Sequence, residues 1–399
     1  MPERSPPPGF DPDDIIPPLL NDDKPWPILS IALDVSGRCN MACRYCAEAA
    51  TQPPRAPMAE ENLESAWHLL HTDEPRAGRS IRLGSGEPLL ALPLLHQLGA
   101  LVARADEPRP RVYVTTNGTL LTSQVRDWLV EAGWDVKISL DGPKAIHDKW
   151  RVTPGGGGTF DQISEAVIDL AERIPPSRFS VTTVLCGGTD PEDAFEGIAA
   201  LGVRRIELVP VVHTSASVLP TLDDIARYEQ FVMAHARRYF ESDDWAEIPV
   251  LAQLRRHIYR LMGYNLFRAS CGAGRSFVGV GPDGDIYPCF RFVGVERYRI
   301  GRLPDGVDPQ AAAAFQRGAG RPYQDRAACR ACWAAPLCGG PCFACAEMFG
   351  PGDGQPVRLH CAYEMADARA AVWLVGQLRQ HNPDRLLAFL PRTITEGLL

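Results

Sequence analysis

The chain has 399 residues, of which 45% are hydrophobic and 23% are charged, and its formal net charge at pH 7 is −8. This composition is ordinary for a soluble globular protein, and the length allows one large domain and a smaller one. The acidic balance argues against nucleic acid and anionic membranes as partners, because binding to either needs a basic face.

Residues 1–26 are rich in proline and aspartate, and we predict an extended arm there. The arm has no apolar segment of the kind that a signal peptide needs. Nowhere does the chain reach the roughly 18 consecutive apolar residues that would span a bilayer. We therefore expect a cytoplasmic protein, in which the twelve cysteines serve metal–thiolate sites rather than disulfides.

Strand-like and helical segments then alternate along the chain. Apolar runs predict strands at residues 28–35, 80–84, 111–116, 135–140, 179–185 and 204–212. Apolar residues spaced three and four apart predict helices between them, as in Leu63, Trp67 and Leu70. Six such units predict an α/β fold, a partial (β/α)6 barrel with a parallel sheet wrapped by helices. In barrels of this kind the functional loops follow the carboxyl ends of the strands.

Two helices, predicted at residues 222–239 and 251–261, lead away from the barrel. The following segment, residues 271–361, is rich in Gly, Pro and Cys, so we expect bound metal to hold it together. A last helix is predicted over residues 366–380. The expected domains are the arm (1–26), the barrel (27–240), a helical linker (241–270), a cysteine-rich domain (271–365) and a terminal helix with a tail (366–399).

Three cysteines follow the first predicted strand with the spacing C-x3-C-x2-C, namely Cys39, Cys43 and Cys46. Three thiolates on one short loop can hold three corners of a [4Fe–4S] cube, which leaves the fourth iron open to a small molecule. Zinc would favour paired C-x-x-C motifs or Cys/His sets, and no histidine lies nearby. A disulfide with one spare thiol, or three core cysteines, are the other interpretations of this pattern.

This loop, which carries Tyr45 before its last cysteine, resembles the cluster motif of radical S-adenosylmethionine (SAM) enzymes. The second strand ends in residues 84–88, Gly-Ser-Gly-Glu-Pro, which resemble the GGEP motif of that family apart from the serine. The resemblance implies that Ser85, Gly86 and Glu87 hold the amino group of SAM, with Tyr45 also at the cofactor. Taken alone, the segment is a tight turn.

The next two strand ends resemble further loops of the same family. Residues 116–118 (Thr-Asn-Gly) and 139–142 (Ser-Leu-Asp-Gly) match its TNG and SLDG motifs. The resemblance implies that Thr116, Ser139 and Arg151 contact SAM, the last two at its ribose and carboxylate end. Taken alone, the Asn-Gly and Asp-Gly pairs are turn residues, and Arg151 is a solvated charge.

A second cysteine pattern occupies the cysteine-rich segment and resembles the seven-cysteine SPASM extension of radical SAM enzymes that act on peptides. Its members are Cys271, Cys289, Cys329, Cys332, Cys338, Cys342 and Cys361. The resemblance implies two auxiliary iron–sulfur clusters, each with its own set of cysteine ligands. One set is complete and consists of Cys329, Cys332, Cys338 and Cys361. The other consists of Cys271, Cys289 and Cys342, with the fourth position open or filled by something else.

An additional cysteine, Cys345, lies beside this second pattern. It could be the missing fourth ligand or could replace Cys361, but we expect the substitution Cys345→Ala to be tolerated. A pair of zinc knuckles is the alternative interpretation of the whole segment. The isolated Cys186 is expected to be a small buried hydrophobic residue.

The resemblance implies that one-electron reduction of the open-site cluster cleaves SAM to methionine and a 5′-deoxyadenosyl radical, which abstracts hydrogen from the substrate. The segments around Cys271 and Cys289 look like those of maturases of ribosomally made peptides, which form C–C, C–O or thioether crosslinks. The expected partners are a precursor peptide or protein and a one-electron donor such as flavodoxin or ferredoxin. Residues 1–26 are too few for the leader-binding domain of many such maturases, so either a separate leader-binding protein presents the leader or the substrate docks without one.

Three other functions are consistent with parts of the pattern. Sulfatase-maturing relatives dehydrogenate Ser or Cys and carry an aspartate base directly after the equivalent of Cys289, where this chain has Phe290. Dehydrogenation of a small molecule such as an amino sugar is the second alternative. A zinc-ribbon adaptor on an α/β scaffold is the third, and it is not an enzyme.

Overall fold

The computed structural model describes residues 27–48, 54–71, 78–263 and 271–388. The predicted arm (1–26), residues 264–270 of the predicted linker and residues 389–399 of the predicted tail lie outside the described residues. The division into domains remains a prediction, whereas the strands and helices can be compared directly.

The six predicted strands are confirmed, and they lie side by side in chain order with parallel pairing. The reason is local, because these strands carry aliphatic residues that become buried. In β4 they alternate with more exposed ones: Val136 and Ile138 are buried, and Lys137 and Ser139 are half-buried. The strands are β1 (Ser30–Leu33), β2 (Ser80–Leu83), β3 (Arg111–Thr116), β4 (Asp135–Ser139), β5 (Phe179–Leu185) and β6 (Arg205–Pro210).

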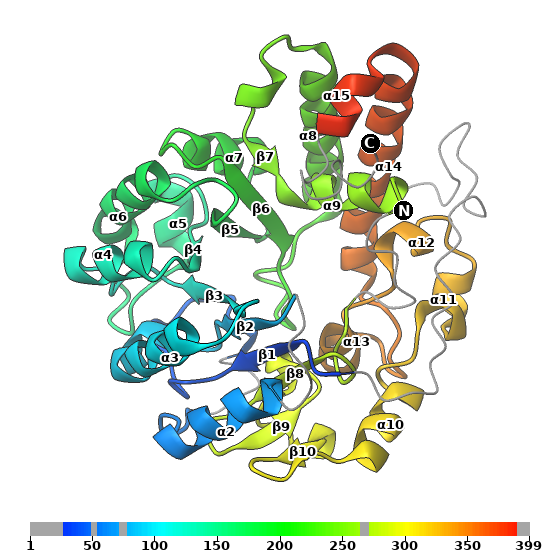
Figure 1. Ribbon diagram of the computed structural model, residues 1–399. Coiled ribbons are helices and arrows are strands. Elements are labelled where there is room, and N and C mark those ends of the chain that lie inside the picture. Colours follow the sequence, from blue (N-terminus) through cyan, green and yellow to red (C-terminus); the bar gives the residue numbers. More distant parts are fainter. Residues whose placement is uncertain (1–26, 49–53, 72–77, 264–270, 389–399) are drawn as a thin grey trace.

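Helices cover the outer side of this curved sheet, so the sheet and helices form the predicted partial barrel (Figure 1). In α6 the buried residues are Ile163, Ala166, Val167 and Leu170, an i, i+3, i+4, i+7 stripe that faces the strands. The helices of this layer are α2 (Glu60–Leu70), α3 (Leu92–Arg104), α4 (Ser123–Glu131), α5 (Lys144–Trp150), α6 (Phe160–Arg173) and α7 (Pro191–Ala199), with the 3-10 turn η2 (Pro88–Ala91) before α3.

The sheet extends beyond the six predicted strands at both edges. β7 (Val250–Leu251) pairs with β6, and β8 (Phe277–Val280) pairs with the free edge of β1, both in parallel. β9 (Asp285–Tyr287), β10 (Gly301–Arg302) and β11 (Gly306–Val307) continue it with antiparallel pairing. Since β8 belongs to the predicted cysteine-rich domain, that domain shares a sheet with the barrel. The strands β7 to β11 have only two to four residues and were not predicted from the sequence.

Three long helices pack together beside the barrel, with the cysteine-rich segment next to them (Figure 1). They are α8 (Leu222–Glu241), α9 (Ala252–Leu261) and α14 (Arg358–His381). Tyr228 of α8 donates a hydrogen bond of 2.6 Å to Asp367 of α14, and Gln253 of α9 donates one of 3.0 Å to Tyr228. The last helix was predicted over residues 366–380 but begins eight residues earlier, so it also carries Cys361.

Short elements lie between and after these three helices, most of them in the cysteine-rich segment. They are α10 (Pro309–Arg317), α11 (Ala327–Arg330), α12 (Ala335–Cys338) and α13 (Phe343–Phe349), the 3-10 turns η3 (Trp245–Glu247), η4 (Phe290–Phe292), η5 (Glu296–Tyr298) and η6 (Tyr323–Asp325), and the terminal α15 (Pro383–Ala388). None of the helices in the described ranges combines the length and the apolar character needed to cross a membrane.

Candidate cluster and cofactor site

The loop with the first three cysteines follows β1 and is held in place by backbone hydrogen bonds from two other loops. Ala42 N donates to Val152 O (2.8 Å) and Arg44 N donates to Trp150 O (3.0 Å), so the loop lies along the end of α5. On its other side, Glu87 N donates to Arg38 O (2.9 Å). The loop is therefore preorganised at the carboxyl end of the barrel strands, where the sequence predicted the chemistry.

The three thiols lie close enough to influence one another. Burial raises the pKa of the Cys43 thiol to about 11; the positive charge of Arg151 opposes this rise, and the neighbouring Cys46 and Cys39 add to it. Burial likewise raises the pKa of Cys39. Thiols whose pKa is raised by burial ionise more readily beside a cation, and the iron of a cluster would supply one. The donor set fits the predicted open-site [4Fe–4S] cluster.

The turn after β2 brings its backbone against the cysteine loop. Gly86 has φ +59°, and a Cβ at this position would lie 2.3 Å from Arg38 O, so only glycine allows the approach. Gly86 N donates to Glu48 Oε2 (3.1 Å), just after the last cysteine of the loop. Ser85 Oγ is buried and has no hydrogen-bond partner among the described residues. An orphaned buried hydroxyl beside the thiols fits a bound polar ligand such as SAM.

Glu87 is completely buried and its carboxylate is used within the protein. Oε1 accepts hydrogen bonds from Thr116 Oγ1 (2.7 Å) and Leu89 N (3.1 Å), and Oε2 accepts one from Asn117 N (2.7 Å). Burial raises the pKa of Glu87, and these hydrogen bonds work against that rise. The predicted cofactor residues Glu87 and Thr116 are thus bonded to each other, and together they join the ends of β2 and β3.

Asn117 contacts the cysteine loop directly, which the sequence did not predict because Asn-Gly is also an ordinary turn pair. Its amide nitrogen donates to Cys39 Sγ (3.7 Å) and to Asn40 Oδ1 (2.8 Å). Thr119 closes this network, since it accepts from Asn40 and donates to Asn117 Oδ1. The position of Asn117 directly after β3 was the only feature of the sequence that could have indicated this role.

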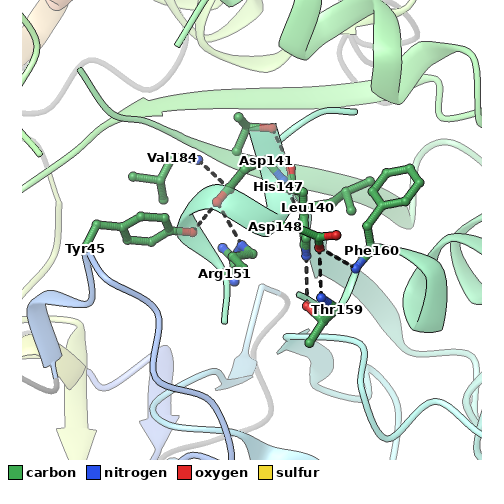
Figure 2. Close-up of polar contacts among 10 residues, drawn as sticks. Tyr45, Leu140, Asp141, His147, Asp148, Arg151, Thr159, Phe160 and Val184 are labelled. Atoms are coloured by element: carbon green, nitrogen blue, oxygen red, sulfur yellow. Dashed lines mark hydrogen bonds and ion pairs between the residues drawn. The ribbon is translucent and has the colours of Figure 1, made fainter. Parts of the chain in front are cut away.

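Figure 2 shows a buried carboxylate that joins three loops, and this residue was also treated as a turn residue from the sequence. Asp141 is completely buried. Its Oδ2 accepts from Tyr45 Oη (2.6 Å) and Arg151 Nε (3.1 Å), and its Oδ1 accepts from Val184 N (3.0 Å). The predicted cofactor residues Tyr45 and Arg151 are therefore brought together by Asp141. Ser139, which ends β4, is half-buried, and among the described residues its side chain makes no hydrogen bond with this group.

The loop that carries Arg151 is fixed by neutral and charged partners on α5 (Figure 2). His147 Nδ1 accepts from Asp141 N (3.3 Å), and its Nε2 lies 2.9 Å from Thr159 Oγ1. Burial lowers the pKa of His147 to about 4, so the ring is neutral at physiological pH. Asp148 accepts hydrogen bonds from the backbone of Thr159 and Phe160 (both 2.9 Å) and holds the start of α6.

The cysteines of the second pattern form two groups whose thiols influence one another. In one, Cys361 interacts with Cys329 and Cys332, and Cys338 interacts with Cys361. In the other, the neighbours are Cys271, Cys289, Cys342 and Cys345. In the described part of the chain, no three His, Cys, Asp or Glu side chains converge tightly enough for a single metal ion. Each group contains four cysteines, the number of thiolates that a cube takes.

Charged residues of α9 and α14 support the first of these groups. Arg260 donates to the carbonyl oxygens of Leu337 and Cys338, the latter at 2.8 Å, and so holds the turn that carries Cys338. Glu364, three residues after Cys361, pairs with Arg256 (2.8 Å) and lies 3.2 Å from His257 Nε2. The segments of α12 and α14 that carry Cys338 and Cys361 are therefore supported by partly buried charged residues of α9 and α14.

Comparison with known proteins agrees with this geometry. Residues 33–202 match the model of the Radical SAM superfamily. The chain is 25% identical to the serine-type anaerobic sulfatase-maturating enzyme of Klebsiella aerogenes over 80% of both chains. It is 27% identical to the mycofactocin maturase MftC of Mycolicibacterium smegmatis over 82% of this chain and 81% of that one.

The fold is shared with the structure of native anSMEcpe with bound AdoMet and Cp18Cys peptide. The TM-score is 0.72 at 20% identity, with 89% of this chain and 99% of that chain covered. Residues 33–202 are a radical SAM domain, in a partial barrel followed by a cysteine-rich region. The whole chain resembles the SPASM-type peptide-modifying maturases.

Proposed function

We propose that this chain is a radical SAM/SPASM maturase that modifies a side chain of a ribosomally made peptide or protein by forming a C–C, C–O or thioether crosslink. One observation carries the proposal. The C-x3-C-x2-C loop is hydrogen-bonded to the loops after β2, β3 and α5, in the same chain as two further groups of cysteines. The similarity over about four fifths of the chain to a sulfatase-maturating enzyme and to MftC supports a peptide or protein as substrate.

Cys39, Cys43 and Cys46 would hold the open-site cluster. Bound there and reduced by one electron, such a cluster would supply the electron for reductive cleavage of SAM and hence the radical chemistry of hydrogen abstraction. The protein positions the cofactor. Arg151 uses only Nε for Asp141 among the described residues, which leaves its two terminal nitrogens for the carboxylate of SAM.

The remaining contacts would surround SAM on its other sides. The unpartnered hydroxyl of Ser85 and the backbone of Gly86 would face the methionine end of SAM, beside the cysteine loop. Glu87 supports this turn through its bonds to Thr116 and Asn117. Because the carboxylate of Glu87 is buried, its contact with the ammonium group of SAM stays a prediction.

Dehydrogenation of a Ser or Cys is the second candidate, because the similarity to the sulfatase-maturating enzyme covers 80% of both chains. The residue directly after Cys289 is Phe290, at the start of η4, and a phenyl ring cannot accept a proton. A reaction of this kind would need another base. We therefore place crosslinking first.

The test is anaerobic incubation of the iron-loaded protein with SAM, a reductant and candidate precursor peptides. 5′-deoxyadenosine is measured by chromatography and the peptides by mass spectrometry. A crosslink or a dehydrogenation removes about two hydrogens without adding mass. The variant with Cys39, Cys43 and Cys46 all replaced by Ala is the matched control.

Fragmentation distinguishes the two outcomes. A crosslink suppresses the backbone fragments between the joined residues, whereas a dehydrogenated serine becomes an aldehyde that reacts with hydroxylamine. Crosslinked peptide supports the proposal. An aldehyde supports the second candidate. Both candidates would be overturned if no peptide increased the production of 5′-deoxyadenosine and no peptide changed in mass.

A further inference from the structure

We infer that Cys345 is the fourth ligand of the site formed by Cys271, Cys289 and Cys342, so that cysteine closes this auxiliary cluster. The inference rests on the proposed function for the presence of auxiliary clusters. It replaces our expectation from the sequence that Cys345→Ala would be tolerated. A closed cube has no open iron, so this site would not bind substrate through the metal.

The local geometry places Cys345 beside a ligand. Cys342 is the N-cap of α13, and Ala346 N donates to Cys342 O (2.9 Å), which begins the helix. Cys345 therefore lies in the first turn, three residues from Cys342 and on the same side. The two thiols are near enough to interact directly. The C-x2-C spacing is one that iron–sulfur proteins use to bind two corners of a cube.

Burial and neighbours place Cys345 within the whole group. Its side chain is 3% exposed and that of Cys289 is 7% exposed. Cys289 interacts electrostatically with Cys342 and Cys271, and Cys345 interacts with Cys342 and Cys289. Strand β8 fixes Cys289, since a Cβ on Gly279 would lie 2.5 Å from the carbonyl carbon of Cys289. The thiol of Cys345 therefore lies beside two of the expected ligands, Cys342 and Cys289, and Cys289 in turn neighbours the third, Cys271.

Charge supports a set of four thiolates. Arg291, on η4, interacts electrostatically with Cys289, Cys342 and Cys345. Four thiolates around a [4Fe–4S] core leave an anionic cluster, and a half-buried guanidinium beside three of them offsets that charge. A ligand set that omitted Cys345 would place a buried thiol against the cluster without a bond to iron.

Other candidates for the fourth position are weaker. Residues 264–270, next to Cys271, contain no cysteine, histidine or carboxylate. The carboxylate that also interacts with Arg291 is Glu48. Glu48 Oε2 accepts a hydrogen bond from Gly86 N in the turn after β2, so this group is engaged at the barrel. Glu48→Gln is therefore the variant that tests the competing assignment.

The experiment uses the full chain with Cys39, Cys43 and Cys46 replaced by Ala, so that only auxiliary clusters contribute. Anaerobically reconstituted protein should hold about eight irons, from two cubes. Cyanide, a small ligand for open iron sites, is added and the electron paramagnetic resonance spectrum of the reduced protein is compared before and after. We expect cyanide to leave the spectrum unchanged when Cys345 is present. The same result is expected for Glu48→Gln and for Cys186→Ala, which removes a buried thiol outside both auxiliary groups.

Cys345→Ala should lose between about one and about four of these irons, or keep them with a spectrum that cyanide now changes. Cys345→Ser is the second variant in case Cys345→Ala folds poorly, and circular dichroism reports on folding in both. Full iron with an unchanged spectrum in both variants would overturn the inference. So would a cyanide-sensitive spectrum with Cys345 in place. If the variant with Cys39, Cys43 and Cys46 replaced by Ala held no iron, the inference would also be overturned. Only this last result would count against the auxiliary clusters of the proposed function as well.

Discussion

The phenol of Tyr45 donates a hydrogen bond of 2.6 Å to Asp141 Oδ2, across 96 residues of sequence. The same oxygen accepts from Arg151 Nε at 3.1 Å, and the guanidinium lies 5.5 Å from the centre of the Tyr45 ring. One buried carboxylate therefore fixes the cysteine loop relative to the arginine that we place at the carboxylate of SAM. We regard Asp141 as a positioning residue for the cofactor.

Asp141→Asn should weaken SAM binding and destabilise the protein. An amide nitrogen at the place of Oδ2 would face the two donors Tyr45 and Arg151, and it would leave the buried charge of Arg151 without its partner. Removing one member of a buried ion pair costs about 3–5 kcal/mol of unfolding free energy. Thermal unfolding and a SAM-binding titration measure the two effects.

Asp148→Asn is the matched control for that experiment, since Asp148 caps α6 on the same loop but does not touch Tyr45 or Arg151. It should lose some stability and keep its SAM affinity. Equal SAM affinities of the two variants would contradict the positioning role of Asp141.

Replacing Cys39, Cys43 and Cys46 by Ala should abolish formation of 5′-deoxyadenosine, because no site remains for the cluster that binds SAM. The auxiliary clusters should persist, so the protein stays brown with about one third less iron. Iron analysis and chromatography of the products check both expectations. Cys186→Ala, outside the three cysteine groups, should keep all its iron. Unchanged deoxyadenosine in the triple variant would refute the cluster assignment.

Glu87→Gln should weaken SAM binding and also lower stability, because the Glu87 carboxylate accepts hydrogen bonds from three donors. A glutamine nitrogen would oppose one of them, at a cost of about 1–3 kcal/mol in unfolding free energy. Loss of a charge-assisted contact with SAM corresponds to a roughly tenfold to hundredfold weaker affinity. Calorimetry with SAM and thermal unfolding separate the two effects.

Glu64→Gln, on the exposed side of α2, should change neither quantity. Weaker SAM binding without lower stability would assign Glu87 to direct contact with the cofactor. Lower stability with unchanged SAM affinity would make Glu87 a purely structural residue of the turn.

Asp367 should make the protein less stable as the pH rises. Burial, aided by the nearby charge of Glu364, raises the pKa of Asp367 from 3.8 to about 8. Between about pH 4 and pH 8 the folded state keeps a proton that the unfolded state has lost, so the unfolding free energy falls through this window. Between pH 6 and pH 8 the decrease from this group is about 2 kcal/mol.

Asp367→Asn should remove this part of the pH dependence, because an amide does not titrate and its oxygen can still accept from Tyr228. Unfolding at pH 6 and pH 8 is the measurement, with the exposed Asp243→Asn as the control. If Asp367→Asn and the parent protein show the same difference between the two pH values, Asp367 is already ionised in the folded state.

Local patterns of the sequence predicted the parts of this protein that depend on neighbouring residues. The strands at residues 111–116 and 179–185 have the bounds expected from their apolar runs, and the helices of the barrel follow from three-and-four spacing. The spacing of Cys39, Cys43 and Cys46 also indicated an open-site cluster without reference to the fold. These features are readable because periodicity and ligand spacing act within a few residues.

Tertiary structure alone decided the contacts between distant segments. β8 pairs with the edge of β1, which lies about 245 residues earlier in the chain. Local periodicity carries no information about a contact between such distant segments. Asp141 and Asn117 read as turn residues, since an Asp-Gly or Asn-Gly pair has the same local preference whether or not its side chain reaches a partner. The place of Cys345 was ambiguous for the same reason. Which thiols lie together depends on how the distant segments that carry Cys289, Cys342 and Cys345 meet, and only the folded chain specifies that.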